Sequence, residues 1–337
     1  MPSTSSIILV SLVVAIAIFI NYPSPPLTGR IKKWKQSGQY FEYKGHNRFY
    51  KESKGSGRDE DILMIFHGFP SSSYDYNKIW DDLTKMFGKV VVLDFLGYGL
   101  SDKPLGHNYL MVEHADSVEF LLKKLGHKRY HILSHDMGDT VAQELIHRQN
   151  KLTEAGKKGE LEILSVCLMN GGIIPETIDM RLLQKVMLNP WLAPIAMRLS
   201  NRIMFKKGFG EVFGEKTQPT PEEFDDYYSV IGYNDGHLVT NDLIQYLPQR
   251  FANRDKWVGA LEQTKIPLHI IFGPSDPVNP HNTFLKRYKE LVPHSGVTEL
   301  PSHISHYPHL EYPEGVVKAY KQFFESWKRN EASKKQE

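Results

Sequence analysis

The sequence has very little cysteine and no acceptor motif for asparagine-linked glycosylation. Cys167 is the only cysteine among 337 residues, so an intramolecular disulfide is excluded. It stands in the apolar run LEILSVCLMN, where a cysteine acts as a small buried hydrophobic residue rather than as a reactive thiol. The motif Asn-X-Ser/Thr does not occur. Both absences favour a reducing environment that faces the cytosol.

An excess of charge of one sign is also missing. The chain has 41 Lys and Arg against 39 Asp and Glu, and no long basic stripe is interleaved with aromatic residues. Nucleic-acid binding is therefore not indicated. The sequence contains no phosphate-binding loop and no dinucleotide fingerprint. His303, His306 and His309 could suggest metal ligands by their spacing, but Pro308 disfavours a regular helix there. We expect neither a metal nor an organic cofactor.

One long apolar run is present, at the amino-terminal end. Ile7 to Ile20 is uncharged and almost wholly apolar. With its polar neighbours it could span ~27 Å, which suits a thin bilayer such as that of the endoplasmic reticulum (ER). A cleaved signal peptide is the alternative, but no basic residue precedes the run and no A-x-A site follows it. Basic residues between Arg30 and Lys35 come afterwards, which favours a cytosolic location for the rest of the chain. We predict a bilayer anchor and basic linker over 1–35.

The carboxyl-terminal residues suggest the same membrane. The chain ends in Lys334-Lys335-Gln336-Glu337, and lysines third and fourth from a cytosolic carboxyl end resemble a dilysine ER-retrieval signal. The alternative is a solvated, charged tail. We predict a disordered tail over 329–337 and an ER-membrane location, with the folded part of the chain facing the cytosol.

Signals for strands and helices alternate after residue 38. QYFEYKGHNRFYKE predicts a hairpin with Lys44-Gly45 at its turn. Short apolar runs follow, and helical patterns such as Val112–Leu125 and Thr140–Arg148 lie between most of them. This alternation predicts an α/β fold, a mostly parallel sheet with helices on both faces. The expected strands are Ile62–Phe66, Val90–Asp94, Tyr130–Ser134, Leu164–Met169, Leu268–Phe272 and Val297–Leu300.

The alternation stops between about Gly172 and Trp257. This stretch is rich in Leu, Met, Trp and Tyr, shows helical spacing in MRLLQKVMLNPWLAPIAMRL, and lacks strand runs. We predict a helical cap over 172–257, inserted into a core made of residues 36–171 and 258–328. Such a cap would cover the carboxyl edge of the sheet, where ligands bind in folds of this kind.

The hexapeptide SHDMGD, residues 134–139, follows a predicted strand and opens a predicted helix. In the nucleophile elbow G-x-S-x-G the central residue occupies a sharp turn, and small residues two positions away let strand and helix come close. Here the small residues are Ser134 and Gly138, and Asp136 stands at the centre. An ordinary aspartate at a helix amino end is the alternative. We predict that Asp136 is a nucleophile.

The loop HGFP, residues 67–70, follows the apolar run DILMIF. Its position suits an oxyanion hole in which the backbone N–H of Phe69 acts together with that of Met137. We expect His67 and Gly68 to support this loop rather than to move protons.

An acid and a base occur on two later loops. GPSDP, residues 273–277, follows the run LHIIF and offers Asp276 at the carboxyl end of a strand. SHYPHLEYP, residues 305–313, follows the strand signal VTEL and offers His306. Asp136, Asp276 and His306 thus occur in that order, each on a loop after a strand. This arrangement predicts a catalytic triad.

HGFP, DFLGYGLSDKP, SHDxG and the histidine segment resemble the epoxide-hydrolase and haloalkane-dehalogenase branch of the α/β-hydrolases. NGGIIPET and GPSDPVNP carry a closer resemblance, to one group of these hydrolases, and it covers most of residues 36–325. In this family the catalytic histidine precedes an aromatic residue and a Glu before x-Pro, which fits His306 among its neighbours. Met137 stands where the family often has Trp, which argues against a dehalogenase and weakens the epoxide assignment. The resemblance also implies proton donors from cap tyrosines, for which the candidates are Tyr227, Tyr228 and Tyr233.

A carboxylate nucleophile suits displacement at a saturated carbon, whereas serine suits acyl carbonyls. We therefore predict hydrolysis of a lipophilic small molecule through an alkyl ester on Asp136, with His306, oriented by Asp276, activating water. Epoxides are the best single substrate class. Two alternatives stay open: an ester or lipid hydrolase or acyltransferase, and a hydrolase fold without activity that serves as a lipid-binding or scaffold protein.

Overall fold

The apolar runs of the sequence form one sheet in the computed structural model, which describes residues 3–20, 24–199 and 201–334. Eight strands lie in the order β1-β2-β4-β3-β5-β6-β7-β8. β2 pairs antiparallel with β1 and β4, and the other neighbours are parallel, so the predicted mostly parallel sheet is confirmed. The strands are β1 (Gln39–Tyr43), β2 (His46–Lys54), β3 (Ile62–Phe66), β4 (Lys89–Leu93), β5 (Arg129–His135), β6 (Glu162–Met169), β7 (Leu268–Phe272) and β8 (Gly296–Glu299).

The predicted hairpin is present between β1 and β2. Lys44 and Gly45 form its turn with φ angles of 52° and 76°. Positive φ at both central residues matches the right-handed twist of the flanking strands. Tyr43 therefore pairs with His46 directly across the turn.

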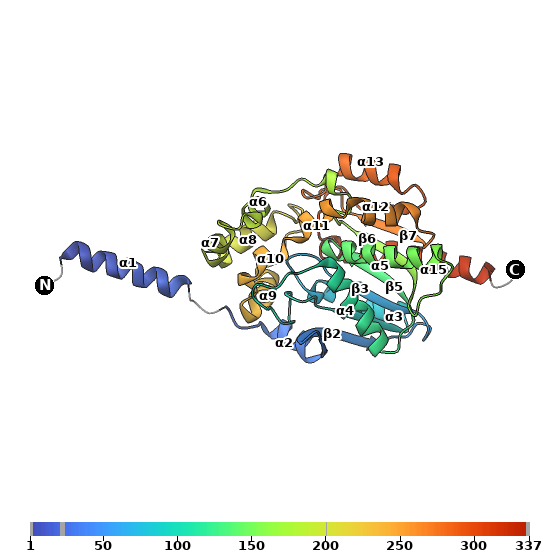
Figure 1. Ribbon diagram of the computed structural model, residues 1–337, viewed down its shortest axis with the longest axis horizontal. Coiled ribbons are helices and arrows are strands. Elements are labelled where there is room, and N and C mark those ends of the chain that lie inside the picture. The colour runs from blue at the N-terminus through green and yellow to red at the C-terminus, as the bar shows by residue number, and fades with distance from the viewer. Residues whose placement is uncertain (1–2, 21–23, 200, 335–337) are drawn as a thin grey trace.

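Helices cover both faces of the sheet (Figure 1). In β3, Met64 and Phe66 belong to one apolar cluster, and Leu63 and Ile65 belong to the other, because successive side chains of a strand point to opposite faces. α4 (Met111–Lys124), α5 (Met137–Glu154), α12 (Arg254–Gln263) and α13 (His281–Leu291) contribute to the first cluster, and α2 (Gly29–Gln36), η1 (Ser73–Lys78), α3 (Trp80–Met86), α14 (Pro308–Glu311) and α15 (Pro313–Lys334) contribute to the second.

The chain between β6 and β7 contains helices and turns but no strand among its described residues, where we predicted the cap. Figure 1 shows most of these helices grouped at one end of the molecule, beyond the sheet. α12 starts at Arg254 and packs against α5, so the end of the predicted cap range belongs to the helices that cover the sheet. The inserted helices are η2 (Pro175–Thr177), α6 (Leu182–Leu188), α7 (Ala193–Leu199), α8 (Arg202–Gly210), α9 (Pro221–Gly232), η3 (Tyr233–Leu238), α10 (Thr240–Leu243) and α11 (Tyr246–Ala252).

The amino-terminal apolar run forms α1 (Thr4–Ile20), a helix of 17 residues. Within the described ranges, no helix combines the length and the apolar character needed to cross a membrane. The predicted basic linker is wrong at its end. Residues from Gly29 form α2, because Thr28 caps the helix and Ile31 and Trp34 are buried.

The carboxyl-terminal helix α15 continues to Lys334. The predicted disordered tail is therefore wrong for residues 329–334, which lack Gly and Pro and contain good helix formers. Lys334 also pairs with Glu331 one turn earlier, with 3.2 Å between Nζ and Oε1. Lys335, the other half of the predicted dilysine signal, lies outside the described residues.

Candidate active site

Asp136 occupies a sharp bend between β5, which ends at His135, and α5, which begins at Met137. Its φ and ψ angles are 48° and −110°, a conformation that costs a residue other than glycine on the order of 1–3 kcal/mol. Gly138 lets the bend close, because a Cβ there would lie 2.7 Å from the carbonyl oxygen of His67. This is the geometry of a nucleophile elbow with a carboxylate at its apex.

The loop after β3 brings a backbone donor to this carboxylate. The N–H of Phe69 donates to Oδ2 of Asp136 over 2.9 Å. A Cβ on Gly68 would lie 2.6 Å from Cβ of Asp136, so the loop comes this close because position 68 is glycine. Met137, the source of the second predicted donor, is the buried first residue of α5. Both predicted oxyanion-hole amides are therefore next to Asp136.

His67 holds this loop in place. Its Nε2 accepts from the N–H of Phe95 over 3.1 Å, and its Nδ1 therefore donates to the carbonyl oxygen of Gly68 over 2.9 Å. An imidazole with one accepting and one donating nitrogen is neutral, and burial lowers the pKa of His67. The structure places His67 where it supports the loop, as expected from the sequence.

His306 and Asp276 form a buried pair at the carboxyl ends of β8 and β7. Nδ1 of His306 lies 2.9 Å from Oδ2 of Asp276. Asn170 and Asn279 donate from Nδ2 to the same oxygen over 3.0 and 2.8 Å, and the N–H of Val278 donates to Oδ1 over 2.8 Å. These donors fix the carboxylate, which can then orient the imidazole.

The carboxylates around His306 control its protonation. Burial lowers the pKa of His306, but the negative charges of Asp276 and Asp136 outweigh burial and raise this pKa to about 9. Burial also raises the pKa of Asp276, yet the charge of His306 and the donated hydrogen bonds leave it lowered overall. Esterification of Asp136 would remove one of the negative charges. It would thus shift His306 towards the neutral form that a general base needs.

Arg250 is a residue of the site that the sequence analysis missed. This side chain reaches from α11 to the elbow, where Nη2 donates to the backbone oxygen of Asp136 over 2.8 Å and lies 3.8 Å from Oδ1. Its Nε donates to Oγ1 of Thr140 over 2.7 Å. A buried guanidinium at this position compensates the charge of the nucleophile. Arg250 lies in a helical segment without a local motif, so no sequence signal pointed to it.

Asn170 was also missed, although a signal for it exists. It directly follows β6 and has a φ of 46°, which asparagine tolerates better than most residues. Its place after a strand, before two glycines, matches that of the other loops that carry site residues. In the sequence, this segment pointed to the family resemblance alone.

Asp136 and His306 line a cavity of ≈ 240 Å³. The cap supplies most of the wall through apolar side chains such as those of Met187, Met197 and Phe209. A carboxylate and an imidazole on the wall of an apolar, covered cavity suit a lipophilic small molecule.

The predicted cap tyrosines differ in position. Tyr228 lines the cavity. Tyr227 is 2% exposed and packs against Phe209, and the hydroxyl of Tyr233 accepts from Nζ of Lys35 over 2.6 Å. Of the three candidates, Tyr228 therefore lines the cavity, whereas Tyr227 and Tyr233 do not. Successive residues of a helix point about 100° apart, so Tyr227 and Tyr228 do not share a face.

Two other tyrosines line the cavity, Tyr246 and Tyr307. The hydroxyl of Tyr307 donates to the carbonyl oxygen of Phe69 over 3.1 Å. The hydroxyl of Tyr246 has no hydrogen-bond partner among the described residues, and burial and the charge of Asp136 raise its pKa. The Tyr246 hydroxyl therefore keeps its proton and can donate it to a molecule in the cavity near Asp136.

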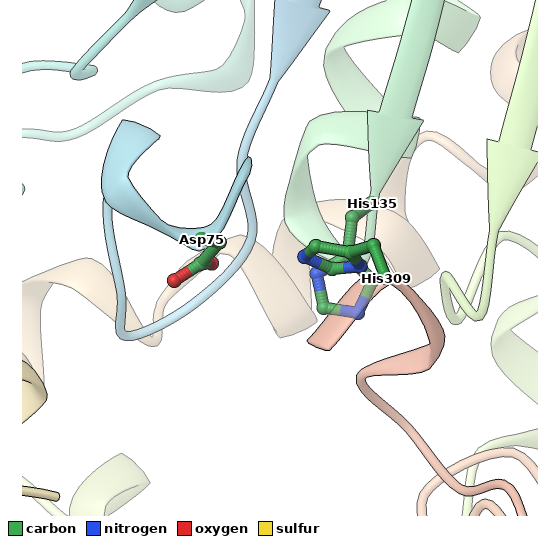
Figure 2. A group of neighbouring side chains, drawn as sticks. All are labelled: Asp75, His135 and His309. Atoms are coloured by element: carbon green, nitrogen blue, oxygen red, sulfur yellow. The ribbon is translucent and has the colours of Figure 1, made fainter. Parts of the chain in front are cut away.

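Figure 2 shows a second group of side chains, Asp75, His135 and His309. The ring of His135 lies 5.0 Å from that of His306, measured between ring centroids. Their possible ligand atoms lie within 4.8 Å of one another, and all three residues are buried. Two imidazole nitrogens and a carboxylate oxygen are donors that zinc accepts. Nε2 of His135 donates to the carbonyl oxygen of His306 over 2.7 Å, which supports the catalytic loop. The group joins three distant segments, so the spacing of histidines in the sequence did not point to it.

Comparison with known proteins agrees with this geometry. The alpha/beta hydrolase fold family matches residues 61–316. The chain is 47% identical to the Mesoderm-specific transcript protein of Mus musculus over 315 residues, which cover 93% of each protein. It is 33% identical to LipZ of Mycobacterium tuberculosis (strain ATCC 25618 / H37Rv) over 289 residues, which cover 86% of this chain and 96% of LipZ.

A solved structure with the same fold is the haloalkane dehalogenase DbeA from Bradyrhizobium elkani USDA94. The two superpose with a TM-score of 0.72 at 20% sequence identity, over 87% of this chain and 99% of DbeA. The family match covers the elbow, the HGFP loop, Asp276 and His306. The chain therefore belongs to the α/β-hydrolase family, as its motifs predicted, and it is a hydrolase of that family.

Proposed function

We propose that this protein hydrolyses a lipophilic epoxide through a covalent ester on Asp136. The observation that carries the proposal is a carboxylate at the apex of the elbow, on the wall of the same apolar cavity as the His306–Asp276 pair. A carboxylate can displace at a saturated carbon and be regenerated by hydrolysis of the ester.

In the first step, a carboxylate oxygen of Asp136 attacks one carbon of the epoxide, and the bond from that carbon to the epoxide oxygen breaks. The oxygen takes up a proton and becomes a hydroxyl. Tyr246 is the preferred donor, because it lines the cavity and its hydroxyl has no other partner among the described residues. Tyr228, which also lines the cavity, is the second candidate.

In the second step, His306 removes a proton from water, and the resulting hydroxide attacks the ester carbonyl carbon of Asp136. The N–H groups of Phe69 and Met137 stabilise the tetrahedral oxyanion. Collapse of this intermediate breaks the bond to the substrate oxygen, which takes the proton of the new carboxyl group, so that a diol leaves and the carboxylate is restored. The proton on His306 then returns, through solvent, to the phenolate of the tyrosine that protonated the epoxide oxygen. The negative charge of Asp136 raises the pKa of His306. Formation of the ester removes this charge and increases the fraction of neutral His306, which favours ester formation first and attack by water second.

The experiment that tests this mechanism separates the two steps. His306→Gln should still form the alkyl ester, so mass spectrometry of the variant after incubation with a long-chain epoxide should find the substrate mass added at Asp136. His303→Gln is the matched control, because His303 is an exposed neighbour on the same loop and this variant should turn over normally. An adduct on Ser134, or the absence of any adduct across a panel of epoxides, would contradict the proposal. Turnover of acyl esters that requires Asp136 would favour an ester hydrolase instead.

We also propose that the protein works at the ER membrane and associates with the bilayer through α1. Support comes from the uncharged, apolar composition of α1 and from the exposure of its side chains, such as Ile8 and Leu9 at 63% and 62%. The basic residues that follow favour a cytosolic orientation. Protease treatment of microsomes that contain the full chain should digest the catalytic domain from outside. Full protection of the domain would contradict this orientation.

A further inference from the structure

The cap helices α6, α7 and α8, together with the turn between α6 and α7, expose large apolar side chains. Trp191 is 83% exposed, Ile203 79% and Leu182 78%, and Leu192 and Ile195 are 52% and 59% exposed. Single exposed apolar residues are ordinary, but a contiguous group marks a surface that contacts a partner or a membrane. These five residues come from one stretch of the cap.

All the charged residues of this stretch are basic. Residues 180–210 contain six Lys and Arg and no Asp or Glu. Lys185, Arg198, Lys206 and Lys207 are exposed, next to the apolar residues along the chain. The whole protein has nearly balanced charge, so the segregation on this segment is local. Exposed Trp and Leu with Lys and Arg and without acids is the composition of helices that lie in a membrane interface.

This surface is continuous with the substrate cavity. Leu183 and Met204 are 44% and 51% exposed, and both also line the cavity that holds Asp136 and His306. A lipophilic molecule that moves along α6 or α8 would therefore reach the nucleophile without crossing the polar parts of the protein surface.

The position of α1 agrees with a lipid partner. Figure 1 shows α1 projecting from the same end of the molecule as α6, α7 and α8, and α1 contacts α7. Both the helix proposed to associate with the bilayer and the apolar cap surface therefore lie at one end of the protein.

We propose that α6, α7 and α8 form a docking surface for a bilayer with anionic headgroups, and that the substrate enters the cavity through this surface. Apolar side chains from Leu182 to Ile203 insert at the level of the headgroups, and the surrounding Lys and Arg attract the anionic lipids. The entry route rests on the proposed hydrolase function, whereas docking does not require activity.

The tryptophans of the chain provide a direct test. Trp191 is exposed, whereas Trp34, Trp80, Trp257 and Trp327 are all 7% exposed or less. Full-length protein is mixed with vesicles of phosphatidylcholine and phosphatidylserine whose acyl chains are brominated, and tryptophan fluorescence is measured. Docking predicts quenching in the native protein and its loss in Trp191→Phe. This readout separates the cap surface from α1, because α1 contains no tryptophan.

A second test uses charge. Lys206→Glu with Lys207→Glu should weaken binding to anionic vesicles at least about tenfold, since each basic residue near such a surface contributes on the order of 1 kcal/mol. The matched control is Lys157→Glu with Lys158→Glu, an exposed lysine pair between α5 and β6, at the opposite edge of the sheet. This control should bind as the native protein does.

Vesicle binding without quenching of Trp191 would overturn the docking surface, even if α1 holds the protein on the vesicle. Self-association that Ile203→Ser abolishes, again without quenching, would assign the surface to a second copy of the chain and would also overturn the proposal. Quenching of Trp191 in a protein that hydrolyses no epoxide would support docking while contradicting the proposed function, so the two failures are distinguishable.

Discussion

Arg250 from the cap and Asp136 from the elbow form a buried ion pair, with 3.8 Å between Nη2 and Oδ1. The same guanidinium donates to the backbone oxygen of Asp136, so one cap side chain contacts both the charge and the strained backbone of the nucleophile. The cap therefore lines the cavity and also contributes a positive charge beside the Asp136 carboxylate.

Arg250→Met should destabilise the protein more than Arg250→Lys does. Removing one partner of a buried pair typically costs about 3–5 kcal/mol, because the remaining charge is uncompensated. Denaturant unfolding of both variants measures the loss. Arg250→Lys keeps the positive charge and should lose less stability, and an equal loss in both variants would contradict the electrostatic role.

His306 should make stability depend on pH above neutrality. Its pKa in the folded protein, about 9, is higher than the ordinary value of 6.5. A raised pKa stabilises the fold fully below the unfolded pKa, and this stabilisation is lost as pH rises through about 9. The free energy of unfolding should therefore fall between pH 7 and pH 10 by up to on the order of 3 kcal/mol from this group. The difference between native protein and His306→Gln isolates the effect. If the two lose stability in parallel over this range, another group is responsible.

Gly68→Ala should lower turnover about 10²- to 10³-fold with little effect outside the site. The added Cβ would lie 2.6 Å from Cβ of Asp136, so the loop must move and the N–H of Phe69 must leave the carboxylate. Loss of one oxyanion-hole donor typically costs about 2.7–4 kcal/mol, or 10²- to 10³-fold in kcat. Steady-state kinetics on an epoxide substrate measures this loss. Gly29→Ala is the matched control, since a Cβ there meets nothing within 4 Å; a mild effect of Gly68→Ala on kcat would mean that the loop does not form the hole.

Tyr246→Phe should slow formation of the ester more than Tyr228→Phe does. Both tyrosines line the cavity, but the hydroxyl of Tyr246 is close enough to Asp136 for the charge to raise its pKa. A positioned proton donor contributes about 10²- to 10⁴-fold. Rapid mixing with the epoxide and mass detection of the ester measure the first step. Tyr227→Phe, buried away from the cavity, is the control; equal rates in Tyr246→Phe and the control would exclude Tyr246 as the donor.

The strands were predictable because their apolar runs are buried on both faces of a parallel sheet. β3 and β7 coincide with the predicted Ile62–Phe66 and Leu268–Phe272. Helix ends were harder to predict, since the end of α15 depends on helix propensity and short-range ion pairs that composition does not display. Residues 329–334 are an example, because they were predicted as a disordered tail but belong to a helix that continues to Lys334.

The positions of Asp136, Asp276 and His306 were predictable from the sequence, because each stands on a short loop fixed by the strand before it. Arg250, Tyr246 and the group of Asp75, His135 and His309 were not, because these residues come together only when the cap and distant loops pack over the sheet edge. The rotation of each cap helix about its own axis likewise decides which tyrosine faces the cavity, and this rotation depends on packing against distant segments.

Local features of the sequence were enough to predict the fold class, the elbow and the order of Asp136, Asp276 and His306. These features are the period of apolar residues, the small residues at a tight turn and the loops at strand ends. The tertiary structure alone decided which residues surround the nucleophile, which apolar side chains of the cap stay exposed, and how charges reach His306. These depend on packing between segments far apart in the chain, and no local pattern encodes the direction in which a helix turns its side chains.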